Sequence, residues 1–140
     1  MSELLKLRQE HAHLVEIVSR LAKVVAGAHP PGAGGLFKLR YELSSALIAH
    51  LKAEDWVLYP RLLASAEGKI AQTARAFSEE MGGLAATYMA YADKWTAAAI
   101  DDDWRGYCVE TAGIIEALTN RITRENRELY PLLEAMDKAA

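Results

Sequence analysis

Cysteine and histidine are both scarce in this chain of 140 residues. Cys108 is the single cysteine, which excludes an internal disulfide and any metal site built from several cysteines. A lone cysteine fits a reducing compartment, and we expect a cytoplasmic protein. The histidines number four, so a histidine-rich site has few candidates: His11, His13, His29 and His50.

Long apolar runs and an excess of positive charge are missing as well. Charged residues interrupt every apolar segment before the roughly 18 to 20 residues that a bilayer span needs, so we expect no membrane helix. The first residues, MSELLKLRQEH, are too charged for the apolar part of a secretory signal. The formal net charge is −3 and no run of basic residues occurs, so nucleic acid is not an expected partner.

Strand-forming residues are few, whereas helix formers dominate. The chain contains 25 Ala and 18 Leu, but Val, Ile and Thr together number only 19. Six of the 13 glycines and prolines fall between Gly27 and Gly35. This concentration predicts a loop, and His29 lies inside it.

Two further breaks divide the rest of the chain into helical lengths. One is the Glu-Gly-Lys stretch at 67–69, and the other is the triple Asp at 101–103, which suits a helix N-terminus. The sequence therefore predicts an all-α fold, specifically an up-down-up-down antiparallel four-helix bundle that forms a single domain over residues 1–140. The expected helices cover approximately 3–26, 35–66, 70–99 and 103–137.

Each expected helix carries a core-facing stripe with spacings of three and four residues. The second stripe runs through Leu36, Leu43, Leu47, His50, Glu54, Val57 and Arg61. Ionisable residues interrupt the stripes near mid-length, where apolar residues belong. These residues are His11, His50, Glu54, Arg121 and Glu125, with Met81 at the same depth on the third helix. The pattern predicts a polar layer in the middle of the core.

An internal repeat links the second and fourth helices. Residues 47–62 (LIAHLKAEDWVLYPRL) align without gaps with residues 118–133 (LTNRITRENRELYPLL). The repeat predicts a pseudo-twofold arrangement in which the glutamates of the two copies face each other across the core. Each copy has a proline after a Leu-Tyr pair, and we expect it to distort its helix, because proline lacks an N–H and clashes with the preceding turn. We expect Tyr59 and Tyr130 to be packing residues with a polar handle, not catalysts.

Three segments together resemble one known family. The segment His50-x-x-x-Glu54-Asp55-x-x-Leu58-Tyr59-Pro60 resembles the signature of the hemerythrin-like, or HHE cation-binding, family. Glu10-His11-x-x-Leu14 is similar to the first metal-ligand segment of that family, and Glu125-x-x-x-Leu129-Tyr130-Pro131 is similar to its fourth. The resemblance covers essentially the whole chain. It implies a four-helix bundle with a non-haem di-iron centre that binds oxygen, nitric oxide or iron itself.

The resemblance is incomplete at two ligand positions. It implies that four residues match family ligands: His11, His50, Glu54 and Glu125. The third-helix histidine of the family corresponds to Met81, and its fourth-helix histidine corresponds to Arg121. A guanidinium stays cationic and cannot replace imidazole as a donor to iron. Because the two missing histidines serve the same iron in the family, we expect this chain to keep one metal site and to lack its neighbour.

The charges of the expected polar layer leave three arrangements open. Two buried carboxylates against one arginine leave an uncompensated negative charge, which is costly in a core. One divalent cation, such as iron, could bind the four matching residues while Arg121 takes the place of the second cation. Alternatively, His11 or His50 is protonated and the network is free of metal. Lastly, one glutamate takes up a proton through a raised pKa.

The remaining candidates are weaker. Glu80 flanks the third stripe and is a reserve ligand, whereas His13 shares its helix face with Lys6, Glu10, Ile17 and Arg20 and is expected on the surface. No nucleophile arrangement, phosphate loop or zinc-binding Cys/His set is present, so hydrolase or transferase activity is not indicated.

Two interpretations of function follow. The first is a binding protein with a partial site, which holds one iron or similar divalent ion and senses or carries oxygen, nitric oxide or metal. The second is a metal-free structural or interaction bundle whose former site is a buried Arg–Glu–His network. The sequence identifies no protein partner.

Overall fold

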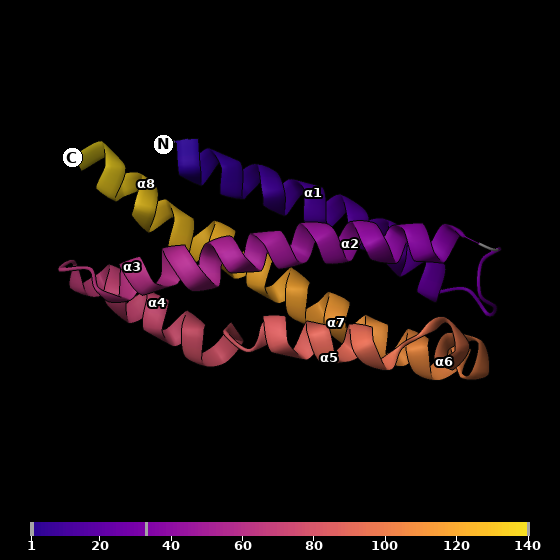
Figure 1. The fold of residues 1–140 in the computed structure, drawn as a ribbon. Coiled ribbons are helices and arrows are strands. Elements are labelled where there is room, and N and C mark those ends of the chain that lie inside the picture. Colours follow the sequence, from indigo (N-terminus) through magenta and orange to yellow (C-terminus); the bar gives the residue numbers. More distant parts are fainter. Residues whose placement is uncertain (1, 33, 140) are drawn as a thin grey trace.

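Helices make up nearly all of the protein in the computed structural model (Figure 1). The structure describes residues 2–32 and 34–139, and the side chains of residues 3–32 and 34–136. Residues 1 and 140 of the expected domain, and residue 33 of the expected loop, lie outside the described residues. The helices in chain order are α1 (Ser2–Val25), α2 (Gly35–Lys52), the π-helix η1 (Ala53–Leu58), α3 (Tyr59–Leu63), α4 (Gly68–Met81), α5 (Leu84–Lys94), α6 (Ala97–Asp102), α7 (Trp104–Arg124), the π-helix η2 (Glu125–Leu129) and α8 (Tyr130–Ala139).

The helices pack side by side as an elongated bundle (Figure 1). α1 packs against both α2 and α7, α3 packs against α4, and α5 packs against α7. The start of α1 and the end of α8 lie at the same end of the molecule (Figure 1). The prediction of an all-helical bundle is confirmed, since no strand occurs in the described part of the chain. No helix among the described residues combines the length and the apolar character that membrane crossing requires.

The third expected helix, 70–99, is divided in the structure. α4 ends at Met81, and a turn at Gly82 and Gly83 separates it from α5. A Cβ atom at Gly82 would collide with the carbonyl oxygen of Ser78, so the chain turns here at a residue without a side chain. A second interruption follows α5, and Thr96 caps the short helix α6 by accepting from the Ala99 N–H.

Both expected proline distortions take the form of a π-helix. In η1 the backbone N–H of Tyr59 bonds to the carbonyl of Glu54, and in η2 the N–H of Tyr130 bonds to the carbonyl of Glu125. Each bond spans five residues instead of the four of an α-helix, and the proline follows at once. The wider turn corrects part of the second expected stripe. Val57 and Arg61, which we expected in the core, are exposed.

A polar layer separates two apolar clusters along the bundle. One cluster contains residues such as Leu14, Leu47 and Leu118, and the other contains Leu7 and Leu129. Along α1, α2–η1 and α7–η2, buried polar residues occur where the chain passes from one cluster to the other. They are His11, His50, Glu54, Arg121 and Glu125, each no more than 2% exposed. The predicted mid-core polar layer is therefore present.

Candidate metal centre

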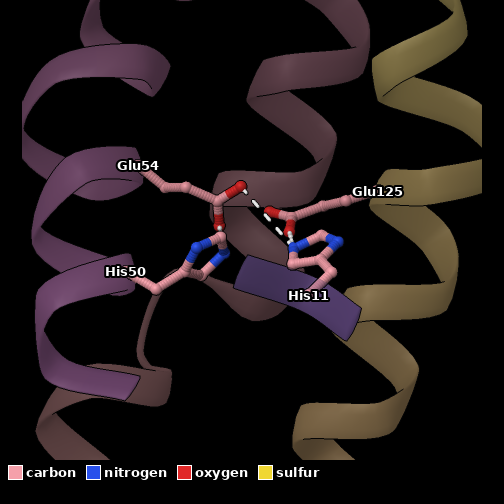
Figure 2. A group of neighbouring side chains, drawn as sticks. All are labelled: His11, His50, Glu54 and Glu125. Atoms are coloured by element: carbon pink, nitrogen blue, oxygen red, sulfur yellow. Dashed lines mark ion pairs between the residues drawn. The ribbon is translucent and has the colours of Figure 1, made fainter. Parts of the chain in front are cut away.

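Four buried side chains converge in the polar layer (Figure 2). α1 carries His11 and α2 carries His50. Glu54 is the second residue of η1, and Glu125 is the first residue of η2. One ligand-type atom from each residue lies within 4.8 Å of the others. Imidazole nitrogens and carboxylate oxygens suit divalent transition metals such as iron. The structure thus brings together all four residues that match the family's ligand positions.

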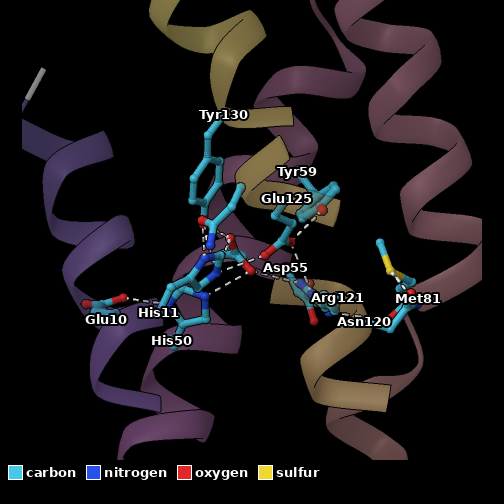
Figure 3. A network of polar contacts seen from close by, with 12 residues as sticks. Glu10, His11, His50, Asp55, Tyr59, Met81, Asn120, Arg121, Glu125 and Tyr130 are labelled. Carbon is cyan, nitrogen blue, oxygen red and sulfur yellow. Dashed lines mark hydrogen bonds and ion pairs between the residues drawn. The ribbon is translucent and has the colours of Figure 1, made fainter. Parts of the chain in front are cut away.

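Both histidines are oriented by a hydrogen bond on the side away from the cluster (Figure 3). His11 Nδ1 lies 2.8 Å from Asn126 Oδ1, and His50 Nδ1 lies 2.7 Å from Glu10 Oε1. Because both partners are oxygen acceptors, each Nδ1 carries the proton. In a neutral imidazole the lone pair is then on Nε2, which faces the cluster. Histidines that bind metals commonly donate their other ring N–H to an oxygen acceptor in this way, which fixes the orientation of the ring.

Each glutamate accepts a hydrogen bond from the tyrosine of the other repeat. Tyr130 Oη donates to Glu54 Oε2 over 2.5 Å, and Tyr59 Oη donates to Glu125 Oε2 over 2.6 Å. In each repeat the π-helical bond joins the tyrosine N–H to the carbonyl of the glutamate five residues earlier. The hydroxyl groups of the tyrosines, which the sequence predicts as the polar handles of packing residues, therefore orient the two carboxylates.

Arg121 joins both glutamates to the third-helix region. Its Nε donates to Glu125 Oε2 over 3.1 Å, and its Nη2 donates to Glu54 Oε1 over 3.2 Å. The same Nη2 donates to Asp55 Oδ1 over 2.6 Å, and Nη1 donates to the Met81 carbonyl over 3.3 Å. That carbonyl belongs to the last turn of α4, which has no helical partner for it. Arg121 thus caps α4 and places its positive charge between the carboxylates.

Two buried atoms in the cluster have no hydrogen-bond partner among the described residues: His50 Nε2 and Glu125 Oε1. Each faces another ligand-type atom at short range. His50 Nε2 lies 3.2 Å from Glu54 Oε1, and His11 Nε2 lies 3.1 Å from Glu125 Oε1. A nitrogen lone pair opposite a carboxylate oxygen is unfavourable unless a proton or a cation lies between them. The residues present therefore fit a cation at this position.

The carboxyl pKa values move in opposite directions. Burial would raise the pKa of Glu54, but the hydrogen bond and charge of His50, the charge of Arg121 and the hydrogen bond from Tyr130 lower it to about 2. Burial and the charge of Glu54 raise the pKa of Glu125, despite contacts with His11, Arg121 and Tyr59. Without a cation, Glu54 therefore keeps its charge and Glu125 takes up a proton more readily.

The basic groups and the phenols complete the charge balance. Burial would lower the pKa of His50, but its contacts with Glu54 and Glu10 outweigh burial and raise it. Burial and the neighbouring carboxylates raise the pKa of Tyr59 and Tyr130, so both phenols stay neutral hydrogen-bond donors when no cation is bound. These directions favour a protonated His50 in the metal-free state, one of the arrangements that the sequence left open.

Sequence reasoning missed the residues that hold the cluster in place. Asp55 and Asn126 are equivalent in the internal repeat, each directly after its glutamate, and they bond to Arg121 and His11 respectively. Glu10 directly precedes His11 and bonds to His50. Their positions next to candidate ligands were the available signal, but their partners lie on other helices.

The other sequence candidates lie outside the cluster. Glu80 is exposed and pairs with Arg124, so the structure does not support it as a reserve ligand. Met81 lies at the edge of an apolar cluster, where its sulfur is 3.7 Å from Asn120 Nδ2 (Figure 3). His13 and His29 are exposed, as expected.

Fold and site together define a helical bundle with a buried His–Glu group that is able to hold a metal ion. A family model, the hemerythrin HHE cation binding domain, matches residues 4–133. The chain belongs to this family. Searches of curated proteins and of solved structures gave no significant match.

Proposed function

We propose that this protein binds a single divalent cation, with iron the first candidate, through His11, His50, Glu54 and Glu125. The observation that carries the proposal is the pair of imidazole Nε2 atoms. Both face carboxylate oxygens at 3.1 to 3.2 Å, and the partners of both Nδ1 atoms leave the Nε2 lone pairs available. When bound, iron would supply a Lewis-acidic and redox-active centre.

Arg121 supports a single cation over a pair. Its guanidinium bonds to both glutamates and to the backbone of Met81, the position that matches the family's third-helix histidine. A fixed positive charge at that place repels a second cation and supplies no lone pair to bind it. The bundle is accordingly proposed to share the up-down hemerythrin topology while holding half of its metal centre.

The proposed biological role is to sense or carry oxygen, nitric oxide or iron. This role comes from family membership and from the redox-active character of iron. The protein's own contribution is the buried layer, since it keeps bulk water from a cation held between the two apolar clusters.

A metal-free polar bundle is the second candidate, and one observation favours it. Arg121 and the two tyrosines already donate hydrogen bonds to three of the four glutamate oxygens. The pKa of His50 is raised, and a protonated His50 adds a further positive charge. In this candidate the network serves fold specificity or a protein interaction.

Metal analysis of tag-free protein after loading with Fe(II) separates the two candidates. We expect about one iron per chain in the native protein and in His13→Ala, a control that removes an exposed histidine. His50→Ala should lose nearly all of the iron. Native protein without stoichiometric iron would contradict cation binding and support the metal-free bundle.

A further inference from the structure

The hydroxyl oxygen of Tyr130 contacts two of the four residues in the buried cluster. This Oη is 2.5 Å from Glu54 Oε2 and 3.2 Å from His11 Nε2. Both are atoms of residues proposed to hold the cation. We infer that the Tyr130 oxygen is a fifth donor of the cation site and that it favours the ferric state of a bound iron; this inference rests on the proposed function.

The two repeat-related tyrosines differ in what surrounds their oxygens. The oxygen of Glu125 that Tyr59 contacts also accepts from Arg121 Nε, and the guanidinium lies 5.4 Å from the Tyr59 ring centre. Tyr59 is therefore on the side of the fixed positive charge. Tyr130 instead contacts a histidine nitrogen and the glutamate oxygen that Arg121 does not contact. Only Tyr130 is placed to reach a cation held by the two histidines.

Tyr130 is also held firmly in this position. It is fully buried, and its ring stacks on His11 with 5.0 Å between ring centres and 16° between planes. The Arg8 guanidinium covers the ring at 5.3 Å. The π-helical bond from the Tyr130 N–H to the Glu125 carbonyl fixes the backbone. A donor that is already oriented needs little reorganisation to bind a cation.

The chemistry of a phenol oxygen sets the preference for the oxidised ion. When the oxygen binds ferric iron, the phenol O–H bond breaks, an oxygen–iron bond forms, and the proton passes to solvent. The anionic oxygen donor stabilises a trivalent cation more than a divalent one, because the attraction grows with the charge. Iron(III) bound to a phenolate also absorbs visible light by charge transfer, which provides a direct readout.

The experiment loads full-length protein with Fe(II), oxidises it with ferricyanide, removes the reagent, and records visible absorption and iron content together. We expect a phenolate charge-transfer band in the native protein and in Tyr59→Phe, and its complete loss in Tyr130→Phe. The iron content of Tyr130→Phe should stay near that of the native protein, since the other four donors remain. We also expect the potential of the bound iron to rise in Tyr130→Phe, as the ferric state loses its preferred donor.

Three outcomes overturn the inference while leaving single-cation binding intact. They are an iron-loaded native protein without the band, a band that survives in Tyr130→Phe, and a band lost in Tyr59→Phe instead. Resonance Raman spectra of native protein with ring-deuterated tyrosine give a test that needs no variant, because phenolate modes must shift with the label. Failure of the native protein to bind iron would instead overturn the proposed function.

Discussion

At the scale of single residues, Arg121 decides how the buried charges are balanced. It is 2% exposed and donates to two glutamates, one aspartate and one backbone carbonyl. The same position in the first repeat is His50, so the two copies place a cation and an imidazole at equivalent points. This difference makes the site asymmetric although the backbone repeats.

Removal of the Arg121 side chain should destabilise the fold strongly. In Arg121→Ala the two glutamates and the Met81 carbonyl lose their shared donor, and uncompensated buried carboxylates cost about 3–5 kcal/mol. Denaturant unfolding in the presence of a chelator measures the loss. Arg124→Ala is the control, because its ion pairs with Glu80 and Glu128 are partly exposed. Equal effects of the two substitutions would contradict the bridging role of Arg121.

The shifted pKa values of Glu54, His50 and Glu125 predict how the stability of the fold depends on pH when no cation is bound. Because the Glu54 pKa of about 2 is below its ordinary 4.5, its contribution is present above pH 4.5 and is lost as the pH falls toward 2. The His50 pKa is raised above 6.5, so its contribution is present below pH 6.5 and is lost as the pH rises through the raised value. The raised pKa of Glu125 acts in the same direction as that of His50.

We therefore expect the Tm of chelator-treated protein to fall as the pH rises from 6.5 through the raised pKa of His50. Thermal unfolding at a series of pH values measures this fall, and His50→Gln should flatten it. A Tm that stays constant from mildly acidic to mildly alkaline pH would show that His50 is not protonated in the metal-free fold.

At the scale of helical elements, the two π-helices aim the glutamates and the tyrosines at one another. Each adds a residue to a turn, so the buried positions after the glutamate shift along the chain. In the second repeat the shift brings Tyr130 and Leu133 into the core. The turn at Gly82 has a related effect, since the end of α4 leaves the Met81 carbonyl available to Arg121.

The two glycines of that turn should respond differently to substitution. Gly82→Ala should destabilise the protein by more than about 1 kcal/mol, because its Cβ meets the backbone oxygen of Ser78. Gly83 has a negative φ and open space around it, so Gly83→Ala should be neutral or stabilising by about 0.4–1 kcal/mol. Denaturant unfolding of the pair measures the contrast. Equal tolerance at both positions would show that the turn does not require Gly82.

Periodicity predicts the helices and the depth of the polar layer, but it cannot predict the π-turns. The stripe through Val57 and Arg61 assumes 3.6 residues per turn, and the added residue in η1 turns both side chains to solvent. The four ligand-type residues could be found because they interrupt apolar stripes. The partners Glu10, Asp55 and Asn126 could not, because only three-dimensional packing shows which helix each one faces.

At the scale of the whole molecule, a polar layer divides one apolar core into two clusters. The layer lies where the two repeats meet, so each half of the chain contributes a glutamate, a tyrosine and a basic side chain. A bound cation would therefore join both halves and stabilise the folded state, by about 2.7 kcal/mol at a free concentration 100 times the Kd. Family membership and the buried donors both point to cation binding.

The most direct test of the single-cation claim is an anomalous difference map from crystals of the iron-loaded protein, measured at the iron absorption edge. The account predicts a single peak among His11, His50, Glu54 and Glu125, with the Arg121 guanidinium on the far side of the carboxylates. Two peaks in the layer, or none in crystals of protein saturated with iron, would contradict it.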